Sequence, residues 1–176
     1  MRKGRPLSEQ DKVTGNARVH VAVAVEELFR RLGARSATVA TAESCTGGMI
    51  SMWLTSVAGS SRYFLGGFCP YSNDAKSALL GVDPGLIAAN GAVSGPVVRA
   101  MAAGARDRLK ATWAISVSGI AGPDGGTPEK PVGTVWIGIA GPATSEEKKF
   151  NFPGDRQGVR EAAAIAAIRF LLEKVK

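Results

Sequence analysis

Helical and strand-like patterns of apolar residues alternate along the whole chain. Between Val19 and Leu32 the apolar positions recur at helical spacing, which predicts an amphipathic helix that ends at Gly33. Over Thr112–Ser118 they alternate with other residues, which predicts a strand. Similar patterns predict strands over Thr38–Ala42 and Tyr63–Tyr71, and helices over Met49–Val57, Asn73–Leu80, Asp83–Asn90, Ser94–Leu109 and from Asp155 onward.

Two further strand-like runs, Val132–Ala140 and Ser145–Phe152, flank Gly141-Pro142 and predict a hairpin, whose strands are antiparallel. Because helices and strands are mixed throughout, we expect an α/β fold. The predicted architecture is a three-layer αβα sandwich with a mixed sheet, mostly parallel with one antiparallel hairpin. Residues 19–176 are predicted to form one domain, and the polar residues 1–18 a flexible basic arm.

The composition is typical of a globular protein, with 45% hydrophobic and 21% charged residues. No apolar run is long enough to span a membrane and none follows the basic start, so a cytoplasmic protein is expected. The single histidine, His20, argues against Ser–His–Asp catalysis and a His-rich metal site. The two cysteines, Cys45 and Cys69, do not make a disulfide framework, and Cys45 is expected to be a buried, inert thiol.

The formal net charge is +7, and residues 1–18 hold five basic against two acidic side chains. A basic domain can attract nucleic acid. Here no basic stripe with interleaved aromatic residues is present, so nucleic acid is not expected as a partner. A phosphorylated small molecule fits the charge equally well, and DNA binding through the basic arm is kept as an alternative.

The segment Ala42–Gly48 is the first candidate site, because it joins a predicted strand to a predicted helix. Such turns lie at the carboxyl edge of the sheet, where α/β proteins place their sites. The amide groups of the first helical turn favour a negative charge, so Ser44 can be a nucleophile beside an oxyanion hole. In the alternative interpretation Ser44 or Thr46 only caps the helix, and Gly47 and Gly48 only serve packing.

A serine nucleophile needs a base, and Lys76 is the candidate. It lies near the start of a predicted helix capped by Ser72 or Asn73, and burial and the positive end of the helix dipole both lower a lysine pKa. Tyr71, at the end of the preceding strand, can relay or donate a proton. The alternative is that Lys76 is a solvated surface residue and Tyr71 an aromatic residue at the rim.

The glycine-rich segment Ser116–Gly126 has little side-chain bulk and suits a backbone cradle for a phosphate or sugar. It is not a Walker A loop, because no Gly-Lys-Ser/Thr closes it. A plain wide turn is the alternative. Arg156, at the start of the last predicted helix, can bind a carboxylate or phosphate, with an ordinary exposed arginine as the alternative.

Several short motifs follow one another in a fixed order: Thr41–Gly48, Ala58–Ser61, Tyr71–Lys76, Gly91–Ser94, Ser118–Gly126, Lys130–Trp136 and Gly154–Arg156. Together they resemble the C-terminal domain of the competence/damage-inducible protein A (CinA) family, over about residues 20–174. Longer members of that family carry a further N-terminal domain. Few residues precede Val19 here, so we expect the activity of that domain to be absent.

The resemblance implies an amidohydrolase, because stand-alone members hydrolyse the carboxamide of nicotinamide mononucleotide to nicotinate mononucleotide and ammonia in pyridine nucleotide salvage. It implies that Ser44, Tyr71 and Lys76 are catalytic and that no cofactor or metal is needed. Lys76 would take the Ser44 proton directly or through Tyr71, and backbone amides over residues 46–48 would stabilise the oxyanion. The expected substrate-binding residues are Thr46, Gly47, Gly48, Ser72, Asn73, Ser118, Gly119, Ile120, Ala121, Gly122 and Arg156.

Two positions depart from the family pattern. Pro70 stands where a β-forming residue is usual, which can shift Tyr71, and Gly95 stands where glutamate is common, which weakens a helix start. The alternative function is a catalytically silent nucleotide-binding module or a partner of competence or DNA-damage proteins. Flat α/β sandwiches often pair, so a homo-oligomer is also kept as an alternative.

Overall fold

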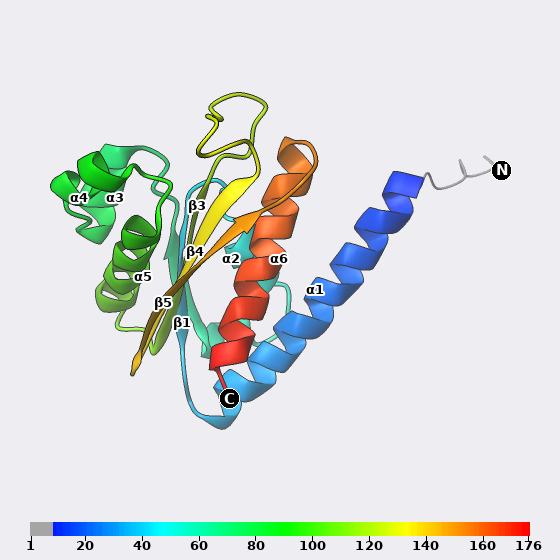
Figure 1. Ribbon diagram of the computed structural model, residues 1–176. Helices are drawn as coiled ribbons and strands as arrows, with labels where there is room; N and C mark the ends of the chain where they lie inside the picture. The colour runs from blue at the N-terminus through cyan, green and yellow to red at the C-terminus, as the bar shows by residue number, and fades with distance from the viewer. Residues whose placement is uncertain (1–8) are drawn as a thin grey trace.

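The computed structural model describes the backbone of residues 9–176 and the side chains of residues 21–176. Helices and strands alternate much as the sequence predicts (Figure 1). The elements in chain order are α1 (Glu9–Ala34), β1 (Val39–Glu43), α2 (Met49–Leu54), a short 3-10 turn η1 (Ser60–Arg62), β2 (Phe64–Phe68), α3 (Asn73–Leu80), α4 (Pro84–Asn90), α5 (Gly95–Leu109), β3 (Trp113–Gly119), β4 (Thr134–Gly141), β5 (Thr144–Asn151) and α6 (Arg156–Lys174).

The strands form one five-stranded sheet in the order β2-β1-β3-β4-β5. β1 pairs in parallel with both β2 and β3, whereas β4 is antiparallel to both β3 and β5. Only β4 therefore runs against the other strands. The parallel strands β1 and β3 lie side by side at the centre, so the segments that follow them begin at the same edge of the sheet.

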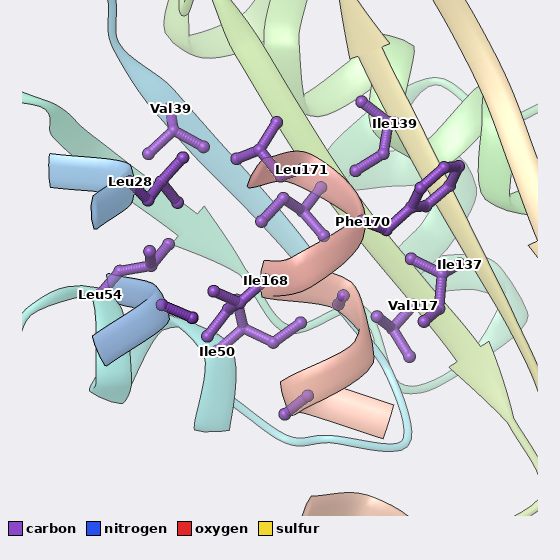
Figure 2. Packing of buried hydrophobic residues seen from close by; sticks show 14 of the residues in the cluster. Leu28, Val39, Ile50, Leu54, Val117, Ile137, Ile139, Ile168, Phe170 and Leu171 are labelled. Atoms are coloured by element: carbon purple, nitrogen blue, oxygen red, sulfur yellow. The ribbon is translucent and has the colours of Figure 1, made fainter. Parts of the chain in front are cut away.

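Helices cover both faces of the sheet and complete the predicted three-layer sandwich. α3, α4 and α5 lie on one face, and α1, α2 and α6 on the other (Figure 1). The larger core lies under α1, α2 and α6, and Figure 2 shows Ile168 and Leu171 of α6 among side chains from α1, α2 and the sheet. The sheet contributes Ile115, Ile137 and Ile139 to this core, all fully buried.

The sheet face under α5 carries much smaller side chains. Ala40, Ala42 and Ala114 belong to the second core, beside Ser116 and Gly138. A Cβ at Gly138 would lie 2.6 Å from the carbonyl oxygen of Val98 in α5, so only glycine lets the helix approach this closely. These small residues therefore set the position of α5 against the centre of the sheet.

The largest differences from the predicted boundaries occur at three places. One is α2, which ends at Leu54 instead of Val57. α1 begins at Glu9, ten residues before the predicted start, while residues 1–8 lie outside the described part. The division into an arm and a domain therefore stays a prediction. β2 ends at Phe68 instead of Tyr71, because Cys69, Pro70 and Tyr71 leave the sheet before α3 begins.

Candidate active site

The candidate site lies where β1 and β3 end. Glu43, the last residue of β1, is in register with Val117 of β3, and the amide of Ser44 donates to the carbonyl oxygen of Val117 at 3.0 Å. Ser44 thus leaves the sheet at its carboxyl edge, directly beside the strand that leads into the glycine-rich segment. This placement is the one the sequence predicts for the first candidate turn.

The carboxylate of Glu43 holds this turn from inside the protein. It is fully buried and accepts from Thr46 Oγ1 at 2.8 Å, Gly48 N at 3.1 Å, Ile50 N at 3.0 Å and Ser51 N at 2.8 Å. The Ser51 hydroxyl adds a further bond at 2.7 Å. A side chain from the preceding strand therefore satisfies the amides at the start of α2, where Gly48 itself provides no side-chain cap.

Ser44 and Lys76 meet beneath the surface. The Nζ atom of Lys76 lies 3.3 Å from the Oγ atom of Ser44, and the two residues are 2% and 8% exposed. The same Nζ atom donates to the carbonyl oxygens of Pro70 at 3.1 Å and Tyr71 at 3.3 Å. Lys76 thus has neutral oxygen partners and, within the described residues, no carboxylate partner.

Burial shifts the pKa values of Lys76 and Cys45, two groups that line the cleft beside Ser44. Desolvation lowers the pKa of Lys76 below its ordinary value of 10.5, and nearby Cys45 opposes this to a smaller extent. Desolvation also raises the pKa of Cys45 to about 12, so Cys45 is a thiol at neutral pH. The amine is therefore shifted toward its basic, neutral form, while the cysteine is shifted away from nucleophilic reactivity.

An open cleft of about 190 Å³ leads to this pair. It brings together eight residues that the sequence analysis proposed, from segments far apart in the chain, and adds Cys45, Ala92 and Val93. The eight are Ser44, Tyr71, Asn73, Lys76, Ser118, Gly119, Ala121 and Arg156.

The other proposed substrate-binding residues do not line the cleft; they are Thr46, Gly47, Gly48, Ser72, Ile120 and Gly122. Most of them have an identifiable structural role. Thr46 and Gly48 donate to Glu43, and Ser72 caps α3 by accepting from Ala75 N. Ile120 forms backbone hydrogen bonds with Gly133 and Thr134 at the start of β4.

The expected oxyanion donors over residues 46–48 need correction. The amide of Gly47 donates to Ser44 O at 3.2 Å, and that of Gly48 donates to Glu43, so neither is free for a ligand. In the described part of the chain, the amides of Cys45 and Thr46 donate no hydrogen bond to another residue. Of these two residues Cys45 lines the cleft and Thr46 does not, so the N–H group of Cys45, next to Ser44, is the donor available there.

Tyr71 lies at the rim of the cleft and is 66% exposed. Its phenol oxygen accepts from Arg156 Nη2 at 3.1 Å, and Arg156 Nη1 donates to Gly122 O at 2.7 Å. The phenol therefore contacts Arg156, whereas the backbone of Tyr71 contacts Lys76. Pro70 lies beyond the end of β2, so its missing N–H costs the sheet no hydrogen bond, and its carbonyl oxygen accepts from Lys76.

Gly95, the second departure from the family pattern, has a packing reason. A Cβ at this position would lie 2.9 Å from the Trp136 ring and 3.0 Å from Glu147 Cγ. The start of α5 is thereby packed closely against β4 and β5, so a larger residue here would displace the helix. Ser94, at the N-cap position, donates to Gly91 O instead of capping through its side chain.

Sequence reasoning missed three residues that hold the site in place. In the sequence, Glu43 stands out only as part of the motif Thr41–Gly48. Arg160 of α6 donates to the carbonyl oxygens of Cys45 and Thr46, and Lys130 donates to the carbonyl oxygens of Asn90 and Val93 beside the cleft. Arg160 follows Arg156 by one helical turn, and this spacing was the available signal that both face the same side.

Neither a metal centre nor a membrane span is found in the part of the chain that the structure describes. No group of three or more His, Cys, Asp and Glu side chains in that part is arranged to hold a metal ion. None of the helices there combines the length and apolar character needed to cross a bilayer. The side chain of His20 lies outside the described residues.

Comparison with known families covers most of the chain. A family model of the CinA C-terminal domain matches residues 21–175. The chain belongs to the CinA C-terminal domain family. The match includes every residue of the candidate site and begins within α1.

Similar CinA-family proteins are known from several bacteria. A CinA-like protein of Citrifermentans bemidjiense is 54% identical over 134 residues, which cover 76% of this chain and 32% of that protein. A CinA-like protein of Geobacter sulfurreducens is 44% identical over 175 residues, covering 98% of this chain and 42% of that protein. The chain thus spans between about a third and two fifths of the length of these curated relatives.

The fold also matches solved structures of the family. The competence/damage inducible protein CihA of Agrobacterium tumefaciens has a TM-score of 0.87 and 35% identity, covering 89% of this chain and 96% of that one. The competence damage-inducible protein A of Klebsiella pneumoniae has a TM-score of 0.85 and 35% identity, covering 88% and 96%. The names of these proteins describe a competence-damage protein family and do not state a reaction.

Proposed function

We propose that this CinA-family domain is an amidohydrolase that converts nicotinamide mononucleotide to nicotinate mononucleotide and ammonia. The observation that carries the proposal is the 3.3 Å contact between Ser44 Oγ and the buried Lys76 Nζ. A hydroxyl beside a desolvated amine is the arrangement that a serine nucleophile needs when no imidazole is at hand. The substrate itself is proposed from the family resemblance.

The first step uses the lowered pKa of Lys76. The neutral amine accepts the Ser44 proton as Oγ attacks the carboxamide carbon, so one C–O bond forms while the carbonyl π bond opens onto its oxygen. Because Lys76 touches Ser44 directly, the proton needs no relay through the Tyr71 phenol. Tyr71 would act at the rim, where its phenol and Arg156 face the cleft.

The amide of Cys45, which lines the cleft, would bind the oxyanion that forms. Backbone donors of this kind are rigid before the reaction starts, and one such donor is worth roughly a hundred- to a thousandfold in rate. When the intermediate collapses, the Lys76 ammonium returns its proton to the leaving nitrogen and ammonia departs. Water, deprotonated by the same amine, then hydrolyses the acyl-serine and releases the carboxylate product.

The dimensions of the cleft suit the carboxamide end of such a substrate. At about 190 Å³ the cleft can hold the pyridine ring and its amide, while the rest of the nucleotide extends outward. A second depression of about 200 Å³ shares Asn73 and Ala92 with the cleft and offers room for the ribose, with the phosphate directed back toward the rim of the cleft. Arg156, exposed at the rim, is the proposed phosphate partner.

The test is ammonia release from nicotinamide mononucleotide by the wild type, Ser44→Ala and Ser56→Ala. Ser56 is an exposed serine beyond α2 and serves as the matched control. We expect turnover by the wild type and the control, and none above background by Ser44→Ala. If the wild type binds the nucleotide without releasing ammonia, the domain is a binding module and the proposal is wrong.

A further inference from the structure

Arg160 reaches from α6 to the outside of the nucleophile turn, opposite the internal contacts of Glu43. Its Nε donates to the carbonyl oxygen of Cys45 and its Nη2 to that of Thr46, both at 3.1 Å. The remaining Nη1 donates to Gln157 on the same helix at 3.1 Å. The planar guanidinium thus binds two successive peptide groups of the turn with adjacent N–H donors.

We propose that Arg160 is a positioning residue that orients and polarises the oxyanion hole. The donor concerned is the amide of Cys45, which lines the cleft, whereas Thr46 is fully buried and does not line it. The bond from Arg160 to the carbonyl oxygen of Cys45 fixes the peptide group that directly follows this amide.

The second bond fixes the neighbouring peptide in the same way. The carbonyl of Thr46 shares its peptide group with the N–H of Gly47, which donates to the carbonyl oxygen of Ser44. The carbonyl of Ser44 in turn shares its peptide group with the N–H of Cys45. A chain of hydrogen bonds therefore runs from Arg160 to this donor, and hydrogen bonds linked through peptide groups reinforce each other. Gly47 makes the approach possible, because a Cβ there would lie 3.3 Å from the Arg160 Nη2 atom and its φ angle is +62°.

The charge of Arg160 points to a role beyond packing. All three of its hydrogen-bond partners are neutral oxygens, and in the described residues no carboxylate lies within ion-pair distance of it. The half-buried guanidinium offsets part of the negative field that the buried Glu43 carboxylate creates from the other side of the turn. The reaction would develop its negative charge at this turn, so the charge of Arg160 favours the transition state over the neutral substrate.

This inference rests on the proposed amidase activity, and the experiment separates the two. Arg160→Gln removes the charge and the paired donors, Arg160→Lys keeps the charge but not the planar fork, and Arg169→Gln is the matched control. Arg169 lies on the same helix and is exposed. Steady-state ammonia release gives kcat and KM, and thermal unfolding establishes that each variant is folded.

A second measurement reports on the oxyanion hole alone. A boronic acid that replaces the carboxamide of the nucleotide forms a tetrahedral anion on serine, whereas nicotinate mononucleotide tests ordinary binding. We expect Arg160→Gln to lower kcat by roughly 10- to 100-fold, less than loss of a whole donor. We expect the boronate affinity to fall by a similar factor, KM and product affinity to change less than about twofold, and Arg160→Lys to be intermediate.

Distinct results overturn the inference and the function. If the wild type releases no ammonia, the proposed function is wrong. If the wild type is active but Arg160→Gln keeps its kcat and its boronate affinity, the inference is wrong while the function stands. The inference is also wrong if the variant loses product binding as much as boronate binding. Should Arg160→Gln fail to fold, the same comparison with Arg160→Lys decides, because that variant must also lose kcat and boronate affinity selectively.

Discussion

Two glycine-rich segments follow neighbouring parallel strands, and they are built in opposite ways. The turn after β1, residues 44–48, is held by the buried Glu43 on one side and by Arg160 on the other. The segment after β3, residues 120–133, projects from the sheet as a loop, and its residues 123–129 are exposed (Figure 1). Near its end, Lys130 donates to the carbonyl oxygens of Asn90 and Val93, and near its start Gly122 O accepts from Arg156. These bonds hold the two ends of the segment and do not involve its tip.

The difference teaches that glycine content alone does not identify a reactive loop. In the first turn, charged side chains from two other elements fix the peptide groups around a buried serine. In the second, glycine serves close approach of the chain to itself, as at Gly133, where a Cβ would overlap the backbone of Phe152. We expect reactivity where directed hydrogen bonds and burial occur together, and of these two segments only the first has both.

The largest expected effect comes from removing the buried amine that faces the first turn. Lys76→Met keeps the apolar stem of the side chain and removes the base, so kcat for ammonia release should fall by roughly 10³- to 10⁴-fold. If the variant keeps more than a tenth of wild-type activity, Lys76 is not the base. The proposed contrast between the two segments would then be wrong.

The pH dependence sharpens this prediction. Since the pKa of Lys76 is lowered in the folded protein, the unfolded chain binds more protons at any pH between the folded pKa and 10.5. Stability should therefore rise with pH in that range, and kcat/KM should rise as Lys76 loses its proton. Lys76→Met should lack this contribution and be at least as stable as the wild type near neutral pH, as measured by thermal unfolding across pH.

The next effect concerns the internal support of the turn. Glu43→Gln places an amide NH₂ where the carboxylate accepts from amides and hydroxyls of residues 46–51, so unpaired donors are buried. The free energy of unfolding should fall by about 3 kcal/mol. Urea unfolding measures it, with Glu146→Gln as the control, because its exposed pair with Lys174 should be worth at most about 1 kcal/mol. Equal losses in both variants would contradict the proposed support.

A smaller effect is expected where the second segment supports the cleft wall. Lys130 Nζ donates to Asn90 O and Val93 O, each at 3.0 Å, and Val93 lines the cleft. Lys130→Met should lower the unfolding free energy by about 1 kcal/mol and raise KM by several-fold while kcat changes little. A fall in kcat without a change in KM would show that the loop acts in the chemistry, which would erase the contrast between the two segments.

The smallest effect is expected at the tip of the second segment. Asp124 is exposed and makes no ion pair with another described residue. Asp124→Asn should change the unfolding free energy by less than about 0.5 kcal/mol and leave kcat and KM unchanged. A substantial loss of turnover by this variant would mean that the tip closes over the substrate.

Much of the fold follows from local pattern. Asp83 and Asp155, the first residues of two predicted helices, cap these helices, since their side chains accept from Gly85 N and Gly158 N. The predicted strands and the mixed, three-layer α/β architecture are also confirmed. The end of β2 was misjudged, because an apolar run continues past Phe68 although the chain has already turned away from the sheet.

The sequence by itself determined which segments become helices and strands, and it marked Ser44 and Lys76 as chemically suited to each other. Only the tertiary structure decided that these two side chains meet, that the Tyr71 phenol faces Arg156, and that Glu43 and Arg160 hold the turn from opposite sides. The reason is physical: caps and periodicity act between near neighbours in the chain. The contacts of the site join residues as far apart as Cys45 and Arg160, which meet only when the sheet and its covering helices have packed.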